Sequence, residues 1–530
     1  MKIKKRKLLR IIIPRFPNFN IYTLAARTTT SAGPLYVATS ASRVDSWDAE
    51  VIDENNLHGR YYPRTKEGGL DHAALQKQTP AAVVGFYGSI TSSVPRLYEL
   101  AGMYKEMGCV TIAGGKHVEN MPEEALACNI DYVFHEEAEI SIRNFLAAFD
   151  EPEARNMVNG ISYLKDECVF RTASQQLVDN LDELPVPDYS LLRFAKMKLY
   201  PVCGTRGCNS NCEFCAVKGR ARNCSADRMM AEIKTLVEKY DAGKFFDVSD
   251  HFAANMKQAI RFLNMFADYQ KKINRRLSLI IQTRITDARS SEYLQALKEA
   301  RVENVCIGFE SPVDESLLAM NKGYLSKDML LWTRKFKKQH VHIHGMFIFG
   351  YPGKNQKDRN FDLKGTVGQY RSFIRKSNID TLQLLLPIPL PGTELRSRLE
   401  REGRLFPVSS IGWEYYDGQY PLFDPQNGVT PLELQQAVGK IMKRFYSISF
   451  FFRIIKNIIL DFPVIVFPSV ITLLIGKIKY VKKAFGFWYR NFFKNNILRF
   501  GGLIIIKNWF RQFRENVFQN KLKKNGISRA

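Results

Sequence analysis

The stretch VCGTRGCNSNCEFCAVKG (202–219) carries four of the nine cysteines of this 530-residue chain. Cys208, Cys212 and Cys215 have the spacing C-x3-C-x2-C. Three thiolates on one short loop can bind three irons of a 4Fe-4S cluster and leave the fourth iron without a protein ligand. Such an open iron is of little use for plain electron transfer, but it suits a substrate that chelates it. We therefore predict a 4Fe-4S cluster with one open iron at this loop.

The alternative for the same loop is a zinc site. Structural zinc commonly takes two C-x2-C pairs, whereas here no second pair follows closely and Cys224 stands alone. Cys203 and Cys224 are expected not to be ligands. An odd number of cysteines with one tight group does not suit a disulfide scaffold and favours a reducing cytosol.

Outward from this loop, apolar runs alternate with helical or polar stretches. Strands are expected within KFFDVSD (244–250), LSLIIQTR (277–284), NVCIGFES (304–311), VHIHGMFIFGYPG (341–353) and TLQLLLPIPLPG (381–392). With the segment near residue 200 they make about six strand–helix units. In parallel α/β folds the chemistry lies at the carboxyl ends of the strands, and polar residues stand at those ends here.

The cysteine motif, with Phe214 before its last cysteine, resembles that of the radical S-adenosylmethionine (SAM) superfamily. Further segments are similar to strand-end motifs of that superfamily, and the resemblance covers about residues 180–446: FDVSDHFAAN (246–255), IGFES (307–311), FIFGYPG (347–353) and PIPLPGTEL (387–395). It implies a partial (β/α)6 barrel. In that family the open iron binds the amino and carboxylate groups of SAM, and one electron cleaves SAM to methionine and a 5′-deoxyadenosyl radical.

The resemblance also implies which side chains contact SAM. Glu310 and Asp250 are acceptors suited to an ammonium group or to ribose hydroxyls. The planar guanidinium of Arg284 suits the methionine carboxylate. The whole expected set is Phe214, Asp250, Gln282, Arg284, Glu310 and Ser311. The alternative for each polar member is an ordinary salt bridge or cap at a strand end.

The first 150 residues also alternate strands with helices, which predicts a parallel sheet with crossover helices. Three of their segments resemble the Rossmann-like cobalamin-binding domain of B12-dependent radical enzymes: AAVVGFYGSITSS (81–93), TIAGGKHVENMPEEAL (111–126) and DYVFHEEAE (131–139). Small residues at strand ends let a flat macrocycle approach the main chain. The expected cobalamin contacts are Gly88, Ser89, Thr91, Ser92, Gly114, Gly115 and His117.

One departure from that family concerns the cobalt ligand. Many cobalamin proteins carry D-x-H-x-x-G after the first strand, and the histidine binds cobalt. Here the region reads IIIPRFPNFNIYTLAAR (11–27) with neither Asp nor His, and His58 lacks the rest of the motif. We expect cobalamin to bind without a histidine lower ligand. The alternative is a degenerate domain that binds nothing.

The chain is expected to be α/β, with a cobalamin-binding domain over 1–150 and a hairpin and linker over 151–195. A radical SAM barrel over 196–395, a helical segment over 396–446 and a basic, aromatic tail over 447–530 follow.

The net charge of +24 belongs to the two ends of the chain. The first ten residues carry +6, residues 440–530 carry +17, and the body between them is close to neutral at +1. This pattern does not suit a nucleic-acid groove on the folded core. The N-terminal apolar run is interrupted by Arg10 and Pro14, so no secretory signal is expected.

Residues 458–476 are apolar except for Asp461, Pro463 and Pro468. A membrane span needs about 20 apolar residues, so this run is borderline. The bases and aromatics around it indicate a segment lying in an anionic membrane surface. The alternative is a helical cap that packs on the barrel. We expect a cytoplasmic protein, peripheral at the inner face of the membrane, with no nucleic-acid partner.

Together the resemblances imply methyl transfer from methylcobalamin to an unactivated carbon of an apolar or lipid-like substrate. The chain is similar to hopanoid methylases and to Mg-protoporphyrin ester cyclase. The cofactors carry such chemistry, so no catalytic side chain is expected beyond the cofactor ligands, and flavodoxin or ferredoxin would supply electrons. The alternatives are a radical cyclisation or oxidative rearrangement, a non-catalytic cobalamin or redox sensor and, less favoured, RNA modification, since the first domain holds only Cys109 and Cys128.

Overall fold

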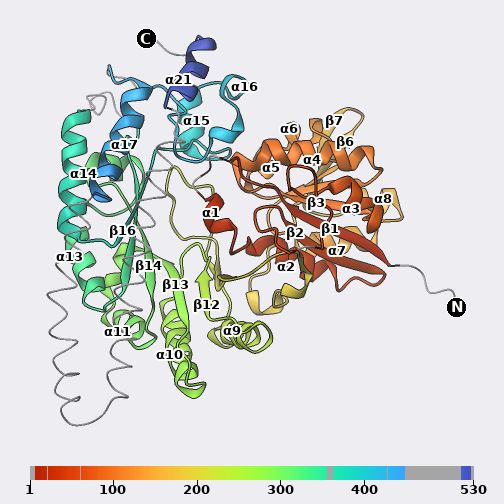
Figure 1. Cartoon of the computed structure of the whole chain (residues 1–530), viewed down its shortest axis with the longest axis horizontal. Coiled ribbons are helices and arrows are strands. Elements are labelled where there is room, and N and C mark those ends of the chain that lie inside the picture. The colour runs from red at the N-terminus through yellow and green to blue at the C-terminus, as the bar shows by residue number, and fades with distance from the viewer. Residues whose placement is uncertain are drawn as a thin grey trace.

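The computed structural model describes residues 6–18, 20, 22–59, 61–354, 362–425, 428–447 and 515–526. Two largely parallel sheets lie side by side within these residues (Figure 1). The N-terminal sheet is drawn in red to yellow and the second sheet in green, and short C-terminal helices lie at the upper end of both.

The first sheet has the strand order β7-β6-β5-β4-β3-β1-β2-β8. β1 pairs in parallel with both β2 and β3, and β4 and β5 continue the parallel part. The winding direction therefore reverses between β1 and β3, which is where sheets of this order bind ligands. Its first strands are β1 (Lys7–Ile13), β2 (Trp47–Asp53), β3 (Val83–Tyr87), β4 (Val110–Gly114) and β5 (Tyr132–Phe134).

Helices cover both faces of this sheet. Leu9 and Ile11 of β1 pack toward α2 (Ala32–Ala41) and α7 (Glu139–Ala147), and Ile12 packs toward α4 (Val94–Glu106) and α6 (Pro122–Ala127). A sheet buried on both faces requires strands that are apolar at nearly every position, and this explains runs such as KLLRIII and VVGFY. The Rossmann-like expectation is confirmed. The remaining helices are α1 (Thr23–Ala26), α3 (His72–Gln78), α5 (Lys116–Asn120) and α8 (Pro152–Asn156).

The first sheet continues past residue 150. The antiparallel hairpin β6 (Ile161–Lys165) and β7 (Cys168–Arg171) adds to β5, and the short strand β8 (Leu192–Arg193) pairs with β2 at the opposite edge. The segment that the sequence assigned to a hairpin and linker thus forms both edges of this sheet.

The second sheet consists of six parallel strands in the order β16-β15-β14-β13-β12-β9. The expected six-stranded parallel barrel sheet is confirmed. Its strands are β9 (Tyr200–Val202), β12 (Lys244–Asp247), β13 (Ser278–Thr283), β14 (Asn304–Glu310), β15 (His342–Ile348) and β16 (Thr381–Leu385). Its helices are α9 (Ala226–Tyr240), α10 (Met256–Lys272), α11 (Ser291–Glu299), α12 (Asp314–Ala319), α13 (Ser326–Lys337) and α14 (Leu363–Ser377).

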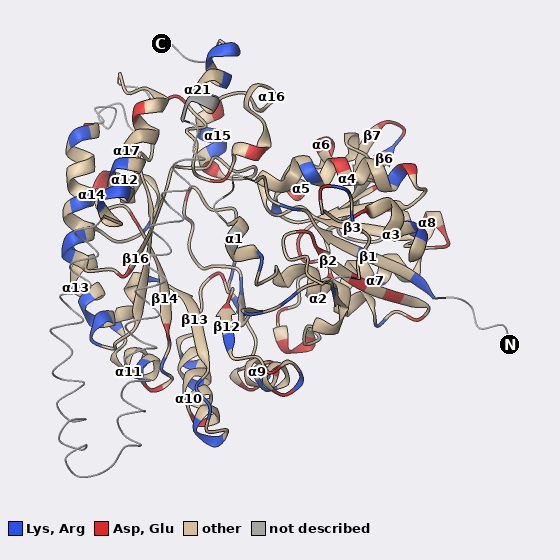
Figure 2. Cartoon of the chain, in the orientation of Figure 1, with Lys and Arg blue, Asp and Glu red and all other residues tan. Residues whose placement is uncertain are grey.

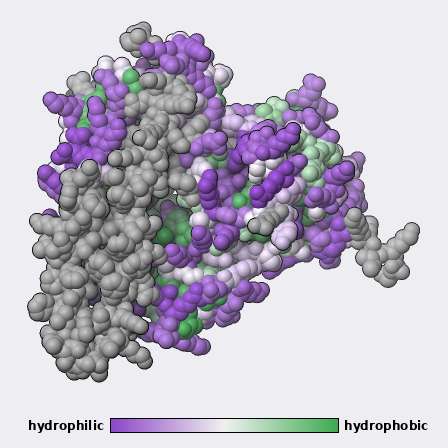
Figure 3. All heavy atoms as spheres, viewed as in Figure 1, coloured by the Kyte–Doolittle hydropathy of each residue, from purple (hydrophilic) through white to green (hydrophobic). Residues whose placement is uncertain are grey.

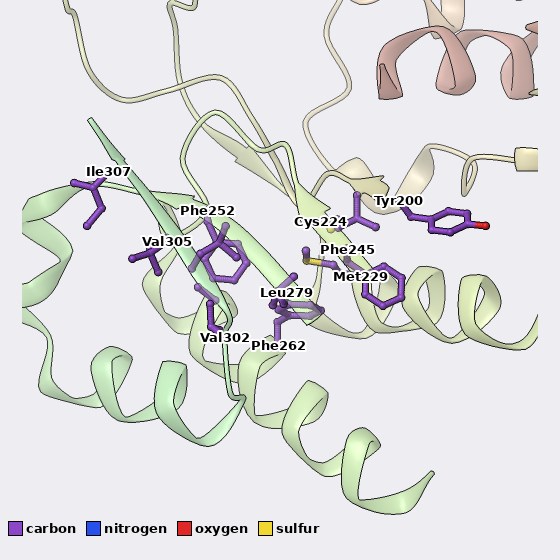
Figure 4. Close-up of a cluster of buried hydrophobic side chains, with 14 of the residues drawn as sticks. Tyr200, Cys224, Met229, Phe245, Phe252, Phe262, Leu279, Val302, Val305 and Ile307 are labelled. Carbon is purple, nitrogen blue, oxygen red and sulfur yellow. The ribbon is translucent and has the colours of Figure 1, made fainter. Parts of the chain in front are cut away.

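Side chains alternate between the two faces of these strands. Phe245 and Leu279 point into the layer of helices, toward Met229 of α9 and Phe262 of α10, and Val305 of the next strand belongs to the same buried cluster (Figure 4). The other face carries the half-buried positions of each strand, as in the burial pattern of β13. This inner face is left for a ligand.

A two-stranded antiparallel ribbon, β10 (Thr205–Arg206) and β11 (Arg222–Asn223), follows β9. It closes the loop 207–221, on which all three motif cysteines lie.

The C-terminal elements are α15 (Glu394–Arg401), α16 (Val408–Ile411), α17 (Pro431–Phe445) and α21 (Glu515–Lys524). In α21, Phe518 and Leu522 are fully buried among aromatic side chains of residues 406–422, and Lys521 Nζ is 3.3 Å from Glu414. This part of the expected tail packs on the body, as the alternative for the tail proposes. The run 458–476 lies outside the described residues. Among the helices that the structure describes, none is long and apolar enough to cross a membrane.

Figure 2 shows Lys and Arg interspersed with Asp and Glu over both sheets and their helices. The near-neutral charge of the body therefore reflects mixing of the two signs along its surface.

Candidate functional site

The middle of the cysteine loop is fixed by Glu213, whose residue is only 2% exposed. Its carboxylate accepts hydrogen bonds from Tyr351 Oη at 2.7 Å and from Arg398 Nε at 2.8 Å. Arg398 Nη2 lies 3.2 Å from the second carboxylate oxygen, so the ion pair is two-pronged. Glu213 thus ties the cysteine loop to the segment after β15 and to α15.

The loop suits a cluster with three protein ligands. Cys208, Cys212 and Cys215 are free thiols, and burial together with the nearby charges of the other two raises the pKa of Cys215. The Val217 N–H lies 3.4 Å from the Cys215 sulfur, and such donors to sulfur tune Fe–S clusters. Among the residues placed by the structure, no three His, Cys, Asp or Glu side chains are grouped to hold a single metal ion. In a 4Fe-4S cluster each thiolate binds its own iron, and three free cysteines on one loop supply the donors that such a cluster needs.

Glu310 ends β14 in a left-handed conformation with φ 60°, at a bulge that starts at Gly308. A bulge re-aims the side chain that follows it and is common beside active sites. A methyl group on Gly308 would lie 2.4 Å from Glu310 Oε1, so a side chain there would displace this carboxylate from its present position. The same oxygen accepts a hydrogen bond from Lys322 Nζ at 3.0 Å.

Lys322 is a site residue that the sequence did not reveal. Its side chain is 11% exposed and that of Glu310 is 12% exposed. Burial lowers the pKa of Lys322, but the charge of Glu310 outweighs it and holds that pKa well above its usual value. Lys322 Nζ also stands 5.8 Å from the centre of the Phe214 ring, so it lies between Glu310 and the cysteine loop.

Arg284 and Tyr324 complete this group. The Tyr324 hydroxyl donates to the Gly308 carbonyl at 2.9 Å. Burial raises the pKa of Tyr324 to about 12, against the lowering charges of Lys322 and Arg284. Arg284 is held at the start of a short turn, where its N–H donates to Asp287 Oδ2 at 2.8 Å. The structure therefore brings Phe214 and Glu310 around Lys322, while Arg284 is near enough to Tyr324 for its charge to lower the pKa of that phenol.

Asp250 lies on the other flank of the cysteine loop and accepts a hydrogen bond from the Gly207 N–H at 2.8 Å. Burial raises the pKa of Asp250, and the hydrogen bond from the Gly207 N–H opposes that rise. Gln282 lies on the inner face of β13, opposite Cys306 of β14 in the strand register. Both positions face the region between the loop and the sheet.

Ser311 is placed differently from the rest of the expected SAM set. It is fully buried, and its hydroxyl is engaged by Tyr370 Oη at 3.0 Å and by the Val313 N–H at 3.0 Å. Ser311 therefore shapes the turn after β14 and does not join the group around Lys322.

At the edge of the first sheet, glycines let the chain approach itself. Gly115 has φ 123°, and a methyl group there would lie 2.5 Å from the Ser89 nitrogen. A methyl group on Gly88 would lie 2.6 Å from Val118, and the Gly88 N–H donates to the Gly114 carbonyl at 2.7 Å. Gly88 and Gly115 thus serve the packing of two loops, while Ser89 and Gly114 stay half-buried at the edge.

The other three residues expected to contact cobalamin are buried and contact other residues of the protein. Thr91, Ser92 and His117 are 4%, 1% and 1% exposed. Ser92 Oγ accepts from Asn20 Nδ2 at 3.1 Å, and the His117 ring packs edge-on against Trp413 with centroids 4.6 Å apart. The structure places them under the C-terminal segment and not at the open edge.

The cysteine loop meets the first domain at its base. Arg206 of β10 lies 2.8 Å from Glu137 and 2.6 Å from Glu139, both of which follow β5. Figure 3 shows an apolar recess in the middle of the molecule, with hydrophilic side chains on its first-domain side.

Glu213, Lys322 and Arg398 are functional candidates that sequence reasoning missed. Glu213 stands inside the cysteine motif, but its spacing to the ligands carries no information on a partner 185 residues away. Lys322 follows Glu310 by 12 residues, across a turn and a helix whose path the sequence does not specify.

Comparison with known proteins gives one family model, the radical SAM superfamily, which matches residues 202–363. An uncharacterized methyltransferase of Pyrococcus horikoshii is 26% identical over 450 residues, covering 81% of this chain and 90% of the relative. The hopanoid C-2 methylase of Rhodopseudomonas palustris is 27% identical over 256 residues, covering 47% of this chain and 46% of the methylase.

A solved structure of the radical SAM methyltransferase TsrM from Kitasatospora setae, with cobalamin and a 4Fe-4S cluster bound, superposes with a TM-score of 0.60. The two chains are 14% identical, and the match covers 75% of this chain and 78% of TsrM. At this identity the likeness concerns the fold alone.

Proposed function

We propose that this chain, whose residues 202–363 match the radical SAM superfamily model and whose fold is similar to that of TsrM with cobalamin and a 4Fe-4S cluster bound, is a cobalamin-dependent methyltransferase. It moves a methyl group to an unactivated carbon of an apolar or lipid-like substrate. The observation that carries the proposal is the contact between the base of the cysteine loop and the end of β5, through Arg206 and Glu137. This contact brings the predicted cluster site next to the edge of the first sheet where a ligand is expected.

When bound, the cluster supplies the electron that cleaves SAM to a 5′-deoxyadenosyl radical, and methylcobalamin supplies the methyl group. Cys208, Cys212 and Cys215 hold the cluster. Glu310, paired with Lys322, accepts from an ammonium or from ribose hydroxyls, and Arg284 pairs with a carboxylate. No side chain is needed as a general base, because an unactivated carbon has no acidic proton to remove.

On the first domain, Ser89 and Gly114 are the expected residues that remain at the edge, next to the reversal of winding between β1 and β3. Sheets of this order bind flat cofactors there. We propose that cobalamin lies at this edge and is contacted mainly by the main chain. The described residues of the segment 14–27, which directly follows β1, include no histidine, and His58 is engaged by the Arg27 carbonyl at 3.0 Å.

The substrate class is supported by two observations. Apolar side chains are visible in the recess of Figure 3. One of the relatives is named as a hopanoid C-2 methylase. An apolar molecule gains about 25 cal/mol for each Å² that it buries in such a recess. The membrane surface and a flavodoxin or ferredoxin electron donor remain predictions from the sequence.

The test is anaerobic turnover of the reconstituted protein with methyl-labelled SAM, cobalamin, a reductant and an apolar extract of the host cells. We expect label in an apolar product together with 5′-deoxyadenosine. Unlabelled products with an altered mass would instead indicate the cyclisation or rearrangement. A protein that consumes no SAM although iron and sulfide are bound contradicts both.

A further inference from the structure

The ribbon at the base of the cysteine loop places two arginines face to face. Arg206 of β10 and Arg222 of β11 are partners in the strand register. Like charges directly opposite each other on paired strands destabilise the pair. Their side chains are only 15% and 7% exposed, so water does little to screen the repulsion. This ribbon therefore needs acidic partners.

Both acidic partners come from the first domain. Glu137 bridges the ribbon: its Oε2 is 2.8 Å from Arg206 Nη1 and 3.3 Å from Arg222 Nη1. Glu139 pairs with Arg206 at 2.6 Å and is 6% exposed. Burial raises the pKa of Glu137, but hydrogen bonds and charge from Arg222 and Arg206 outweigh it and leave that pKa below its usual value. Two acids thus neutralise two bases across the domain boundary.

These four side chains lie at the place where the relative position of the two domains matters for the reaction. Glu137 follows β5, at the carboxyl edge of the first sheet, and the ribbon carries the cysteine loop of the second. A reaction between groups bound on the two domains depends on their separation, and a misplacement of about 1 Å can cost about 100-fold in rate.

We propose that Glu137 and Glu139, with Arg206 and Arg222, form an interdomain clamp that positions the cysteine loop against the first domain. They act as positioning residues, because they touch each other and not the reacting atoms. This inference rests on the proposed function, in which both domains carry a cofactor. The competing interpretation is an ion-pair cluster that only stabilises the fold.

The chain offers a matched control on the same loop. Arg220 lies 2.5 Å from Asp179, and both side chains are 73% exposed. Asp179 belongs to the connection after β7, not to the edge of the first sheet. An exposed pair of this kind contributes little, so Asp179→Asn removes an ion pair from the loop without touching the clamp.

The experiment compares two rates in the full-length reconstituted protein. Reductive cleavage of SAM to 5′-deoxyadenosine needs the second domain alone. Transfer of the methyl group from the SAM sulfonium to added cob(I)alamin, with S-adenosylhomocysteine leaving, needs both domains. We expect Glu137→Gln to keep the first rate within about twofold and to lower the second at least about tenfold. Asp179→Asn should leave both rates unchanged.

A second readout needs no cofactor. In the protein as purified, amide hydrogen exchange of residues 205–223 and 135–140 should rise in Glu137→Gln and not in Asp179→Asn. Glu137→Asp keeps the charge and the fold but shortens the reach, and it should show the same loss of methyl transfer.

The clamp is wrong if both rates fall in parallel, or if neither the rate ratio nor the exchange changes. A wild-type protein that cleaves SAM but passes no methyl group to cob(I)alamin would contradict the proposed function, and the exchange experiment would still decide whether the clamp exists.

Discussion

At the carboxyl edge of the first sheet the expected ligand residues are small and neutral, whereas at the same edge of the second sheet they are charged. Around Gly115, the chain packs on Ser89, and the nearby Ser92 hydroxyl accepts a hydrogen bond from the Asn20 amide. Around Lys322, a buried carboxylate and a phenol gather next to Phe214 of the cysteine loop.

The difference shows how far the type of a residue at a strand end predicts that it contacts a ligand. A glycine at a strand end serves equally well to admit a ligand or to admit another loop, and Gly88 and Gly115 admit another loop. A carboxylate at a bulge with left-handed backbone costs free energy that packing alone does not require. At Glu310 the left-handed backbone coincides with a buried ion pair beside the cysteine loop, and this combination is the better indicator of function.

The largest effect is expected from substitution of a motif cysteine at the second edge. Cys212→Ala removes one of three cluster ligands, so we expect loss of bound iron and of 5′-deoxyadenosine formation. Cys203→Ala is the matched control, since burial raises the pKa of Cys203 to about 12 and keeps it a neutral thiol. Iron analysis and SAM cleavage measure both. Full iron content in Cys212→Ala would mean that the cluster is held elsewhere.

Gly115→Ala tests the close approach at the first edge. A side chain with φ 123° and a contact of 2.5 Å to Ser89 should lower the free energy of unfolding by about 3 kcal/mol. Gly108→Ala, with φ 78° and no atom within 4 Å, carries the backbone strain alone and should cost about 1 kcal/mol. Urea unfolding measures the two. Equal losses would show that the contact with Ser89 is unimportant.

Lys322→Met tests the charged group at the second edge. Removal of the ammonium leaves the Glu310 carboxylate unpaired and largely buried, so we expect a loss of about 2 kcal/mol in unfolding free energy. Lys271→Met, in an ion pair whose side chains are 77% and 76% exposed, should lose less than about 0.5 kcal/mol. A stable Lys322→Met protein would mean that Glu310 finds another partner.

The smallest effect on the free energy of unfolding is expected at Glu137, between the two edges, and this effect depends on pH. The pKa of Glu137 is lower in the folded protein than its ordinary value of 4.5, so its ion pairs stabilise the fold above that pH. The stabilisation is lost as the pH falls through the folded pKa.

Wild type should therefore exceed Glu137→Gln by about 1 kcal/mol at pH 7, and the gap should close as the pH falls below 4.5. Urea unfolding at pH 7, 5 and 4 measures it. A gap that widens on acidification would reverse the assigned sign.

Much of the fold was predictable. Both parallel sheets were expected from apolar runs of strand length between helical stretches, and C-x3-C-x2-C within 202–219 indicated the superfamily whose model matches 202–363. The extension of the first sheet by β6, β7 and β8 was not expected, because edge strands joined through a proline-rich connection carry little pattern of their own.

The candidate site was predictable in part. Asp250, Gln282, Arg284 and Glu310 lie at or near strand ends, and Asp250 is bonded to the cysteine loop, while Ser311 and His117 are buried within the protein. Strand-end position can be read from a sequence, but the direction and partners of a side chain cannot.

By itself the sequence determined the kind and order of the elements and the spacing of the cysteines, because these depend on neighbours within a few residues. Only the tertiary structure decided that Glu213 pairs with Arg398 and that Glu137 bridges Arg206 and Arg222. Those pairs join residues 185, 69 and 85 positions apart. Their formation depends on how two sheets and a loop pack together, and no local pattern of residues encodes that arrangement.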